Sequence, residues 1–417
     1  MREQLNGWVR EAKPVLRGLL RSPGYTIVAV LTLAIGIGGS VAVFTVLDRV
    51  VLDPLAYPEA DRLVHLRNQV PGVGPDTEWH MASAQYFYYR ENAASIEEIG
   101  AFRHTGTNLQ TPAGPQRARL AVVSASTLGM IGARAVLGRM IDAADDRPGE
   151  PRVAMISHEF WTRQFGSEGN ILGQTISLND LPYDVVGIMA AGVNLPAEPG
   201  APSGSVPDAW IPMRLNPAGP FHNNHVIPMI ARLRPGVGLE EAQGELERLT
   251  ALLPEAFPTV YTQGFIDRYG FRPIAYPLKE YVVGDVARNL WILFGAVGLV
   301  LLVACANVTN LFLVRMEDRR HELAIRSALG AGRFAVARAI LTESLTLSVT
   351  GGLLGLLLGF WGLSALISLA PMTIPRLHGL GLDGGAILVT TIVSGLVGFG
   401  IAAFPIAHHV GSGEAAT

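Results

Sequence analysis

The sequence is poor in the residues that most enzyme sites need. It has a single cysteine, Cys305, and two lysines, Lys13 and Lys279, among 417 residues. One cysteine excludes an intrachain disulfide, so any water-exposed domain must depend on an ordinary hydrophobic core. Neither lysine stands in a Gly-x-x-x-x-Gly-Lys-Ser/Thr phosphate-binding loop, and the Gly-x-Ser-x-Gly and His-Glu-x-x-His spacings are absent. We therefore expect no catalytic residue, no metal and no cofactor on this chain.

Charged residues are also scarce. They make up 16% of the sequence against 49% hydrophobic residues, and the mean hydropathy is +0.32. This balance is too apolar for an ordinary soluble enzyme and too polar for a protein that lies entirely in lipid. The formal net charge of -3 gives no reason to expect a nucleic-acid partner.

Four long apolar stretches without any charge predict helices that cross a lipid membrane. They cover residues 22–47, 289–314, 344–370 and 384–407, and each reaches the roughly 20 residues that a bilayer requires. A cleaved signal peptide is the alternative for the first stretch, but that stretch is too long and has no small-x-small cleavage site before Asp48. We expect an α+β membrane protein with four transmembrane helices and a large extracytoplasmic α/β domain between the first two.

The distribution of Lys and Arg predicts the orientation. Residues 1–21 carry five basic residues against Glu3 and Glu11, and the loop 315–343 carries six arginines. The loop 371–383 holds Arg376 alone, and residues 48–288 hold fewer basic than acidic residues. We therefore expect the amphipathic segment 1–21, the loop 315–343 and the tail 408–417 to be cytoplasmic.

Residues 48–288 change to short apolar runs separated by turn residues. Expected strands cover 62–68, 152–156, 183–189, 226–233 and 271–278, and expected helices cover 83–92, 159–165 and 239–253. The segment 179–182, Asn-Asp-Leu-Pro, predicts a hairpin turn. We expect one subdomain built from 48–135 and 216–288, and a second one, 136–215, inserted in it.

Small and polar residues recur inside the predicted membrane helices. Gly351, Gly355 and Gly359 repeat every four residues, which favours a helix seam within one chain or between two; the alternative is the ordinary abundance of glycine in such helices. Asn307 and Asn310 lie at membrane depth, where we expect hydrogen-bonded helix packing rather than an ion site. His222 and His225 could bind a metal, but a solvated loop explains them better.

The loop 315–343 contains a short amphipathic pattern. Its members are Glu322, Leu323, Ile325, Arg326, Ala328, Leu329, Gly330 and Ala331. The apolar face consists of Leu323, Ile325, Ala328 and Leu329. Glu322 and Arg326 flank this face, and Gly330 is a natural helix stop. A basic loop that only sets the membrane topology is the alternative.

This loop, with residues 304–311 before it and 341–344 after it, resembles the FtsX/MacB-type ABC transporter permease family. Glu322, Arg326, the Ala-Leu-Gly-Ala run 328–331 and Arg333 carry the match. Residues 21–26, 33–38 and 160–187 resemble one module of the large duplicated MacB-like permeases, so the resemblance covers essentially the whole chain.

The resemblance implies a permease of the bacterial inner membrane with a porter-like periplasmic subdomain, 48–135 and 216–288, and the inserted subdomain 136–215. The loop 315–343 would dock on a separate ABC ATPase and transmit its motion to the periplasmic domain, to expel or extract a drug, peptide or lipoprotein. Implied partners are a second copy or module and a periplasmic or outer-membrane protein. The chain departs from the fused, duplicated members of this family in two ways. It lacks an ATPase, and it contains one module where they contain two. A single module would make the chain a fragment or a half that pairs with itself.

Two other functions remain open from the sequence. One is a membrane signalling or regulatory protein whose external domain controls a cell-wall hydrolase or senses antimicrobial peptides. The other is a membrane-tethered external enzyme, which the missing catalytic motifs disfavour.

Overall fold

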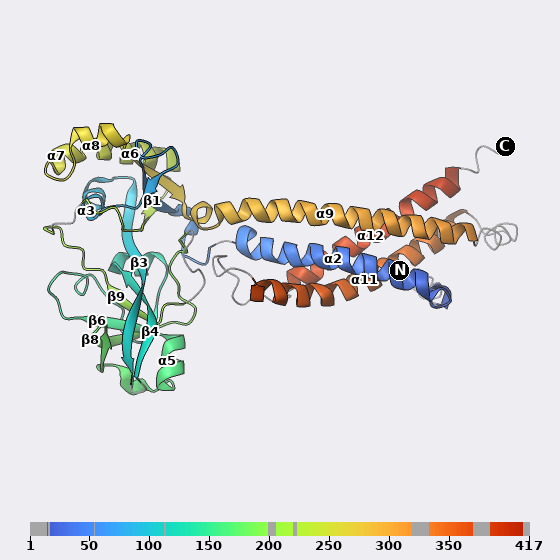
Figure 1. Ribbon diagram of the computed structural model, residues 1–417, viewed down its shortest axis with the longest axis horizontal. Coiled ribbons are helices and arrows are strands. Elements are labelled where there is room, and N and C mark those ends of the chain that lie inside the picture. Colours follow the sequence, from blue (N-terminus) through green and yellow to red (C-terminus); the bar gives the residue numbers. More distant parts are fainter. Residues whose placement is uncertain are drawn as a thin grey trace. The chain divides into compact units, whose positions relative to one another are not determined.

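The computed structural model describes residues 15, 17–53, 55–111, 114–198, 206–219, 223–318, 333–369 and 384–411. The chain divides into two compact units. Met1–Asp53 and Asp285–Thr417 form the first, which we call the helical unit, and Pro54–Gly284 form the second, the sheet unit. Figure 1 labels the four long helices of the helical unit and several of the helices and strands of the sheet unit.

Four long helices make up the described part of the helical unit. They are α2 (Pro23–Leu47), α9 (Leu278–Asp318), whose first residues belong to the sheet unit, α11 (Arg333–Leu369) and α12 (Gly384–Gly411). A π-helical turn, η1 (Asp48–Leu52), continues α2. Each helix contains a segment long and apolar enough to cross a membrane: Pro23–Leu52, Val286–Glu317, Val336–Ser364 and Gly384–Ala407. The prediction of four transmembrane helices is confirmed.

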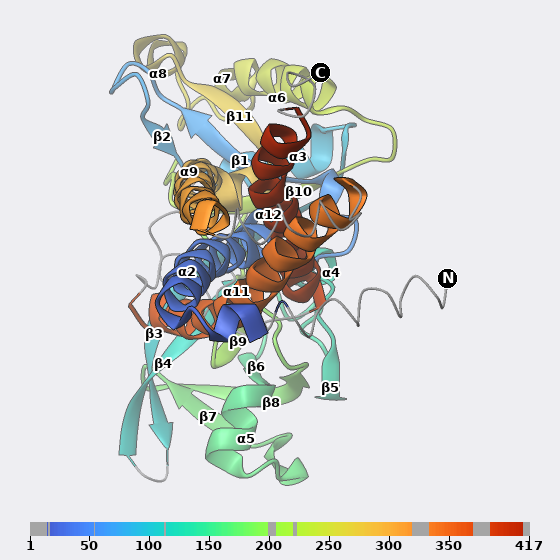
Figure 2. The ribbon, with the colours of Figure 1, turned by 90° about the vertical axis from the view of Figure 1, so that its right-hand side faces the viewer.

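The four helices share one apolar core. Ile37 of α2, Phe312 of α9, Leu347 of α11 and Ile401 of α12 are buried in the same cluster. Helix α11 packs along both α2 and α12, and Figure 2 shows these three helices end-on. Helix α9 is the least covered span, because only 11% of its most apolar window is buried.

The sheet unit is built on eleven strands. Their order is β11-β1-β10-β3-β4-β9-β6-β8-β5, with β2 on β1 and β7 on both β3 and β8. The strands are β1 (Leu63–Gln69), β2 (Glu78–Trp79), β3 (Ile96–Thr111), β4 (Gly114–Val123), β5 (Ala135–Gly138), β6 (Val153–Ser157), β7 (Thr175–Leu178), β8 (Leu181–Met189), β9 (Ala209–Pro212), β10 (Met229–Leu233) and β11 (Arg272–Pro277). The β4–β9 and β6–β8 pairs are parallel and the others are antiparallel.

Short helices accompany these strands. They are η2 (Ala60–Arg62), α3 (Ser83–Asn92), α4 (Ala125–Met130), α5 (His158–Phe165), η3 (Gly169–Ile171), α6 (Leu239–Ala251), α7 (Leu253–Ala256) and α8 (Gln263–Tyr269). Side chains of β1 alternate between two cores, as the pleat requires. Val64 and Leu66 join the cluster of Tyr89 on α3 and Leu246 on α6, whereas Leu63 joins a second cluster.

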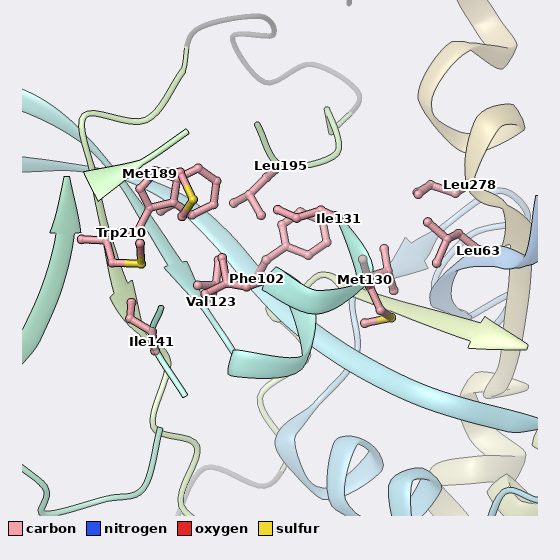
Figure 3. Close-up of a cluster of buried hydrophobic side chains, with 14 of the residues drawn as sticks. Leu63, Phe102, Val123, Met130, Ile131, Ile141, Met189, Leu195, Trp210 and Leu278 are labelled. Atoms are coloured by element: carbon pink, nitrogen blue, oxygen red, sulfur yellow. The ribbon is translucent and has the colours of Figure 1, made fainter. Parts of the chain in front are cut away.

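The second cluster links distant parts of the sheet unit. Phe102 of β3, Met189 of β8 and Trp210 of β9 lie in it together with Leu63 and Leu278. Figure 3 shows Leu63 beside Leu278, the first residue of α9. Helix α9 therefore begins inside the core of the sheet unit.

Local elements agree well with the sequence-based expectations. The helix predicted at 83–92 is α3, Ser83–Asn92, and the strand predicted at 183–189 lies in β8. The predicted hairpin turn is confirmed: Asn179 and Asp180 connect β7 to β8 with φ of 48° and 63°. Asn and Asp tolerate this left-handed conformation better than other side chains. The helix expected over 239–253 ends as α6 at Ala251, and α7 with Pro254 follows it.

The strand pairing does not follow the predicted subdomain boundary at residue 136. Strand β4 pairs along its whole length with β3, and it also pairs in parallel with β9, which lies in the predicted insert. The long β3–β4 hairpin, placed by the sequence analysis in the first subdomain, thus carries strands of the insert. The pattern of one segment cannot reveal this, because strand pairing is a long-range property. The first part of β3 pairs with β10 of the other predicted subdomain, so the β3–β4 hairpin contacts both. The division into 48–135 with 216–288 and 136–215 remains a proposal.

Candidate functional site

Glycines of α11 lie directly against the backbone of α2. A Cβ atom on Gly355 would lie 2.9 Å from the carbonyl oxygen of Ala34 and 3.0 Å from the amide nitrogen of Gly38. A Cβ atom on Gly38 would lie 2.5 Å from the carbonyl oxygen of Gly355, and one on Gly359 would lie 3.1 Å from that of Gly38. The absence of side chains here lets the two helix backbones approach closely. These contacts are all within one chain.

The same helix meets two other neighbours through small residues. A Cβ atom on Gly351 would lie 2.8 Å from the Cβ of Leu33 in α2. On the side of α12, a Cβ atom on Gly352 would overlap the hydroxyl of Ser394. These distances support the assignment of Gly351, Gly355 and Gly359 to a helix seam, and we keep that assignment as a proposal.

A buried ion pair joins α9 and α11 at the end of the apolar spans. Arg315 Nη1 lies 2.8 Å from Glu343 Oε1, and their side chains are 10% and 16% exposed. The guanidinium also donates a hydrogen bond of 2.6 Å to the carbonyl oxygen of Gly18 and lies 4.6 Å from the ring centroid of Tyr25. Arg315 of α9 therefore contacts three other segments of the helical unit: α11, α2 and the segment that holds Gly18.

No sequence pattern predicts this ion pair. Arg315 contributes to the predicted membrane orientation, and Glu343 is the last residue of the same predicted loop. A usable signal existed, since each charge directly borders an apolar stretch. Opposite charges at such helix ends can pair when the helices lie side by side.

The two predicted polar residues of α9, Asn307 and Asn310, are both exposed. Neither makes a hydrogen bond to another residue within the described ranges. The expectation of hydrogen-bonded helix packing at these two residues stays a prediction. Both side chains lie on α9, the span with the smallest buried share among the four described.

The predicted ATPase-coupling residues, 322–331, lie outside the described residues. Their flanks are described: α9 ends at Asp318 and α11 begins at Arg333. The loop is thus bounded directly by the two helices that the Arg315–Glu343 ion pair connects.

The segment around His225 is a loop, as expected, but the His225 side chain is only partly exposed. Its ring is packed among aromatic rings, with centroid distances of 5.1 Å to Phe271 and 5.9 Å to Tyr261. Its Nε2 atom lies 2.8 Å from Asn223 Oδ1. Burial lowers the pKa of His225 to about 4, so the ring is neutral at pH 7. His222 lies outside the described residues.

The described residues bring together another group that the sequence analysis did not connect. His65, His80 and Glu198 each direct a possible ligand atom to one place, with all three atoms within 4.8 Å of one another. Two imidazoles and a carboxylate are ligands that a divalent transition metal accepts. No local spacing links the three positions, so no sequence pattern could have found them.

Comparison with protein families matches most of the chain. Residues 26–249 match the MacB-like periplasmic core domain, and residues 294–410 match the FtsX-like permease C-terminal domain. The first match covers more than half of the chain.

Individual relatives agree with these domains. The macrolide export ATP-binding/permease protein MacB of Burkholderia pseudomallei is 24% identical over 262 residues, which cover 61% of this chain and 37% of that protein. The MacB protein of the same description from Nitrosomonas europaea is 25% identical over 261 residues, 57% of this chain and 35% of that protein. The chain thus spans about a third of the length of these curated relatives.

Two solved structures resemble part of the chain. The periplasmic region of MacB from Actinobacillus actinomycetemcomitans has a TM-score of 0.38 and 13% identity, and it covers 54% of this chain and 93% of that one. The extracellular domain of the ABC-type transporter YknZ from Gram-positive bacteria has a TM-score of 0.35 and 10% identity, and it covers 51% of this chain and 99% of that one.

The domain matches follow the order of the elements along the chain. The periplasmic core match runs from within α2 through most of the sheet unit, and the permease match covers the spans of α9, α11 and α12. The two domain matches together show that the chain belongs to the FtsX/MacB-type ABC transporter permease family.

Proposed function

We propose that this chain is a permease subunit that transmits the ATP-driven motion of a separate ATPase to a periplasmic domain. The observation that carries the proposal is the continuity of α9. This helix begins at Leu278, which is fully buried in the core of the sheet unit, and runs without a break to Asp318 in the helical unit.

The length of α9 fits a force-transmitting element. Its 41 residues span about 60 Å at a rise of roughly 1.5 Å per residue. A bilayer's hydrocarbon core is about 30 Å thick, so the helix is long enough to cross it and to extend well beyond it. A push on one end of a continuous hydrogen-bonded helix is carried to the other end.

The Arg315–Glu343 ion pair gives this helix a fixed partner near the proposed coupling loop. Residues 322–331 lie in the connection between α9 and α11, and the ion pair ties those helices together next to it. A force applied by an ATPase at the loop would therefore act on both helices at once. The glycine seam would pass it from α11 to α2.

In this proposal the ATPase is a separate subunit, and no residues of this sequence form a Gly-x-x-x-x-Gly-Lys-Ser/Thr phosphate-binding loop. We further propose that a second copy or module covers the exposed face of α9, where Asn307 and Asn310 would find partners. The protein would lie in a bacterial inner membrane with the sheet unit in the periplasm. Its relatives are described as macrolide exporters, and the proposed cargo is a drug, peptide or lipoprotein.

Affinity purification of the full chain tests the coupling loop. Ile325→Asp would bury a charge in the ATPase contact, which costs several kcal/mol, and should abolish both co-purification of an ABC ATPase and its stimulated hydrolysis. Ile325→Leu, which preserves the apolar volume, should retain both. Equal ATPase recovery with the two variants would contradict the docking assignment and leave the loop as a topology-setting basic segment.

A further inference from the structure

We propose that His65, His80 and Glu198 form a binding site for a divalent transition metal of the zinc class within the sheet unit. The site is separate from the helix seam and from the coupling loop. It would give the sheet unit a ligand of its own.

The three side chains come from separate segments that the fold brings together. His65 lies on β1, His80 follows β2 directly, and Glu198 lies in the segment after β8. Their ligand atoms lie within 4.8 Å of one another, and His80 Nε2 lies 3.8 Å from Glu198 Oε2. Zinc bonds of about 2.0–2.2 Å to nitrogen and oxygen would need these atoms to close in by about 1 Å, which side-chain rotation can supply.

Unsatisfied polar atoms point to a missing ligand. His65 is fully buried, and both of its ring nitrogens lack a hydrogen-bond partner among the described residues. Nδ1 of His80 and Oε1 of Glu198 are also buried without a partner in that part of the chain. Buried polar atoms are nearly always paired in folded proteins. A metal ion bound between the three side chains would engage one ligand atom of each.

The surroundings hold the ligands in place. Tyr281 stacks on the His65 ring with centroids 3.6 Å apart and an interplanar angle of 9°, which fixes the ring plane. The Tyr281 hydroxyl accepts a hydrogen bond of 2.9 Å from Arg67. Residues that orient a ligand in this way raise the affinity of metal sites.

The charge around the site is compatible with a cation. Arg67 is the nearby positive group, and its Nε atom lies 3.0 Å from Oε2 of Glu78, which neutralises it. Glu198 is the one carboxylate among the three candidate ligands.

The identity of the ligands suits zinc, and the structural role that we propose rests on the separate segments that the ion would join. Two histidines and one carboxylate leave a fourth position for water or for a group of another molecule. A bound ion would tie the segment after β8 to β1, two parts that otherwise meet through apolar contacts such as Leu195 with its neighbours.

Metal binding by the full chain in detergent tests the site. The protein is purified without a polyhistidine tag, stripped with a chelator and titrated with Zn²⁺ by calorimetry; Co²⁺ is used separately for its visible absorption. We expect one high-affinity Zn²⁺ per chain, a Co²⁺ spectrum typical of four- or five-coordination, and a higher melting temperature with Zn²⁺. Glu198→Gln and His80→Gln should weaken binding by at least the roughly 10–100-fold that loss of a supporting hydrogen bond alone causes.

His158→Gln provides the matched control, because His158 lies on α5 outside this cluster. It should bind Zn²⁺ as the unchanged chain does. His65→Gln is interpreted only if circular dichroism shows an intact fold, since His65 is fully buried. The proposal would be overturned if the unchanged chain did not bind Zn²⁺. It would also be overturned if Glu198→Gln and His80→Gln bound Zn²⁺ with the same affinity as the control.

Discussion

Arg315 of α9 and Glu343 of α11 form an ion pair of 2.8 Å inside the helical unit. Arg315 also reaches Gly18 and Tyr25, so it connects α9 with α11 and with the region where α2 begins. A charged side chain that is buried between membrane-spanning helices is stable only when it is paired. The pair therefore sets how α9 and α11 lie against each other near the proposed coupling loop.

Removing one partner of this pair should destabilise the helical unit. Glu343→Gln leaves the buried guanidinium without its counter-charge, and breaking such a pair costs about 3–5 kcal/mol. We expect a clearly lower melting temperature in detergent. The measurement is thermal unfolding followed by intrinsic fluorescence.

An apolar replacement of both partners separates the charge effect from packing. The double variant Arg315→Met with Glu343→Leu should be closer to the unchanged chain than Glu343→Gln is, because no unpaired charge remains. A double variant as unstable as the single one would mean that the remaining Arg315 contacts, not the ion pair, are what matters.

A large side chain in the glycine seam should force α2 and α11 apart. Gly355→Leu places atoms where a Cβ already lies 2.9 Å from the Ala34 carbonyl oxygen, and overpacking of this kind costs about 1–3 kcal/mol. Gly362→Leu is the control on the same helix, since a Cβ there has nothing within 4 Å. Thermal unfolding of the two variants gives the comparison, and equal stabilities would refute the seam.

Deletion of the predicted insert should unfold the remainder of the sheet unit. Removing 136–215 deletes β9, the parallel partner of β4, and Trp210, which is fully buried in the same cluster as Leu63. We expect circular dichroism of the purified deletion variant to show no cooperative transition. A remainder that melts cooperatively would instead support the boundary at residue 136.

Cysteine labelling should report the proposed orientation. In a Cys305→Ala background, a single cysteine placed near Gly200 should react with a membrane-impermeant maleimide in intact cells, and one placed near Arg319 should react only after permeabilisation. The reason is the excess of Lys and Arg in 1–21 and 315–343. The reverse labelling pattern would require the opposite topology.

Features that depend on neighbours in the chain could be predicted from the sequence. The four spans follow from uninterrupted apolar stretches, and helix α3 follows from a local pattern. The Asn179–Asp180 turn follows from the ability of these residues to adopt positive φ. The family resemblance also rested on local motifs, and the family matches agree with it.

The tertiary structure alone decided which distant residues meet. Periodicity places Gly355 on a face of its helix, but only the packing of α11 on α2 sets Gly38 against it. His65 and Glu198 are far apart in the chain and come together because the sheet unit buries the segment after β8 beside β1. Burial of apolar surface drives such encounters without regard to sequence position. Local patterns thus suffice for the helices, the strands and their membrane character, whereas the glycine contacts, the ion pair and the candidate metal site require the folded chain.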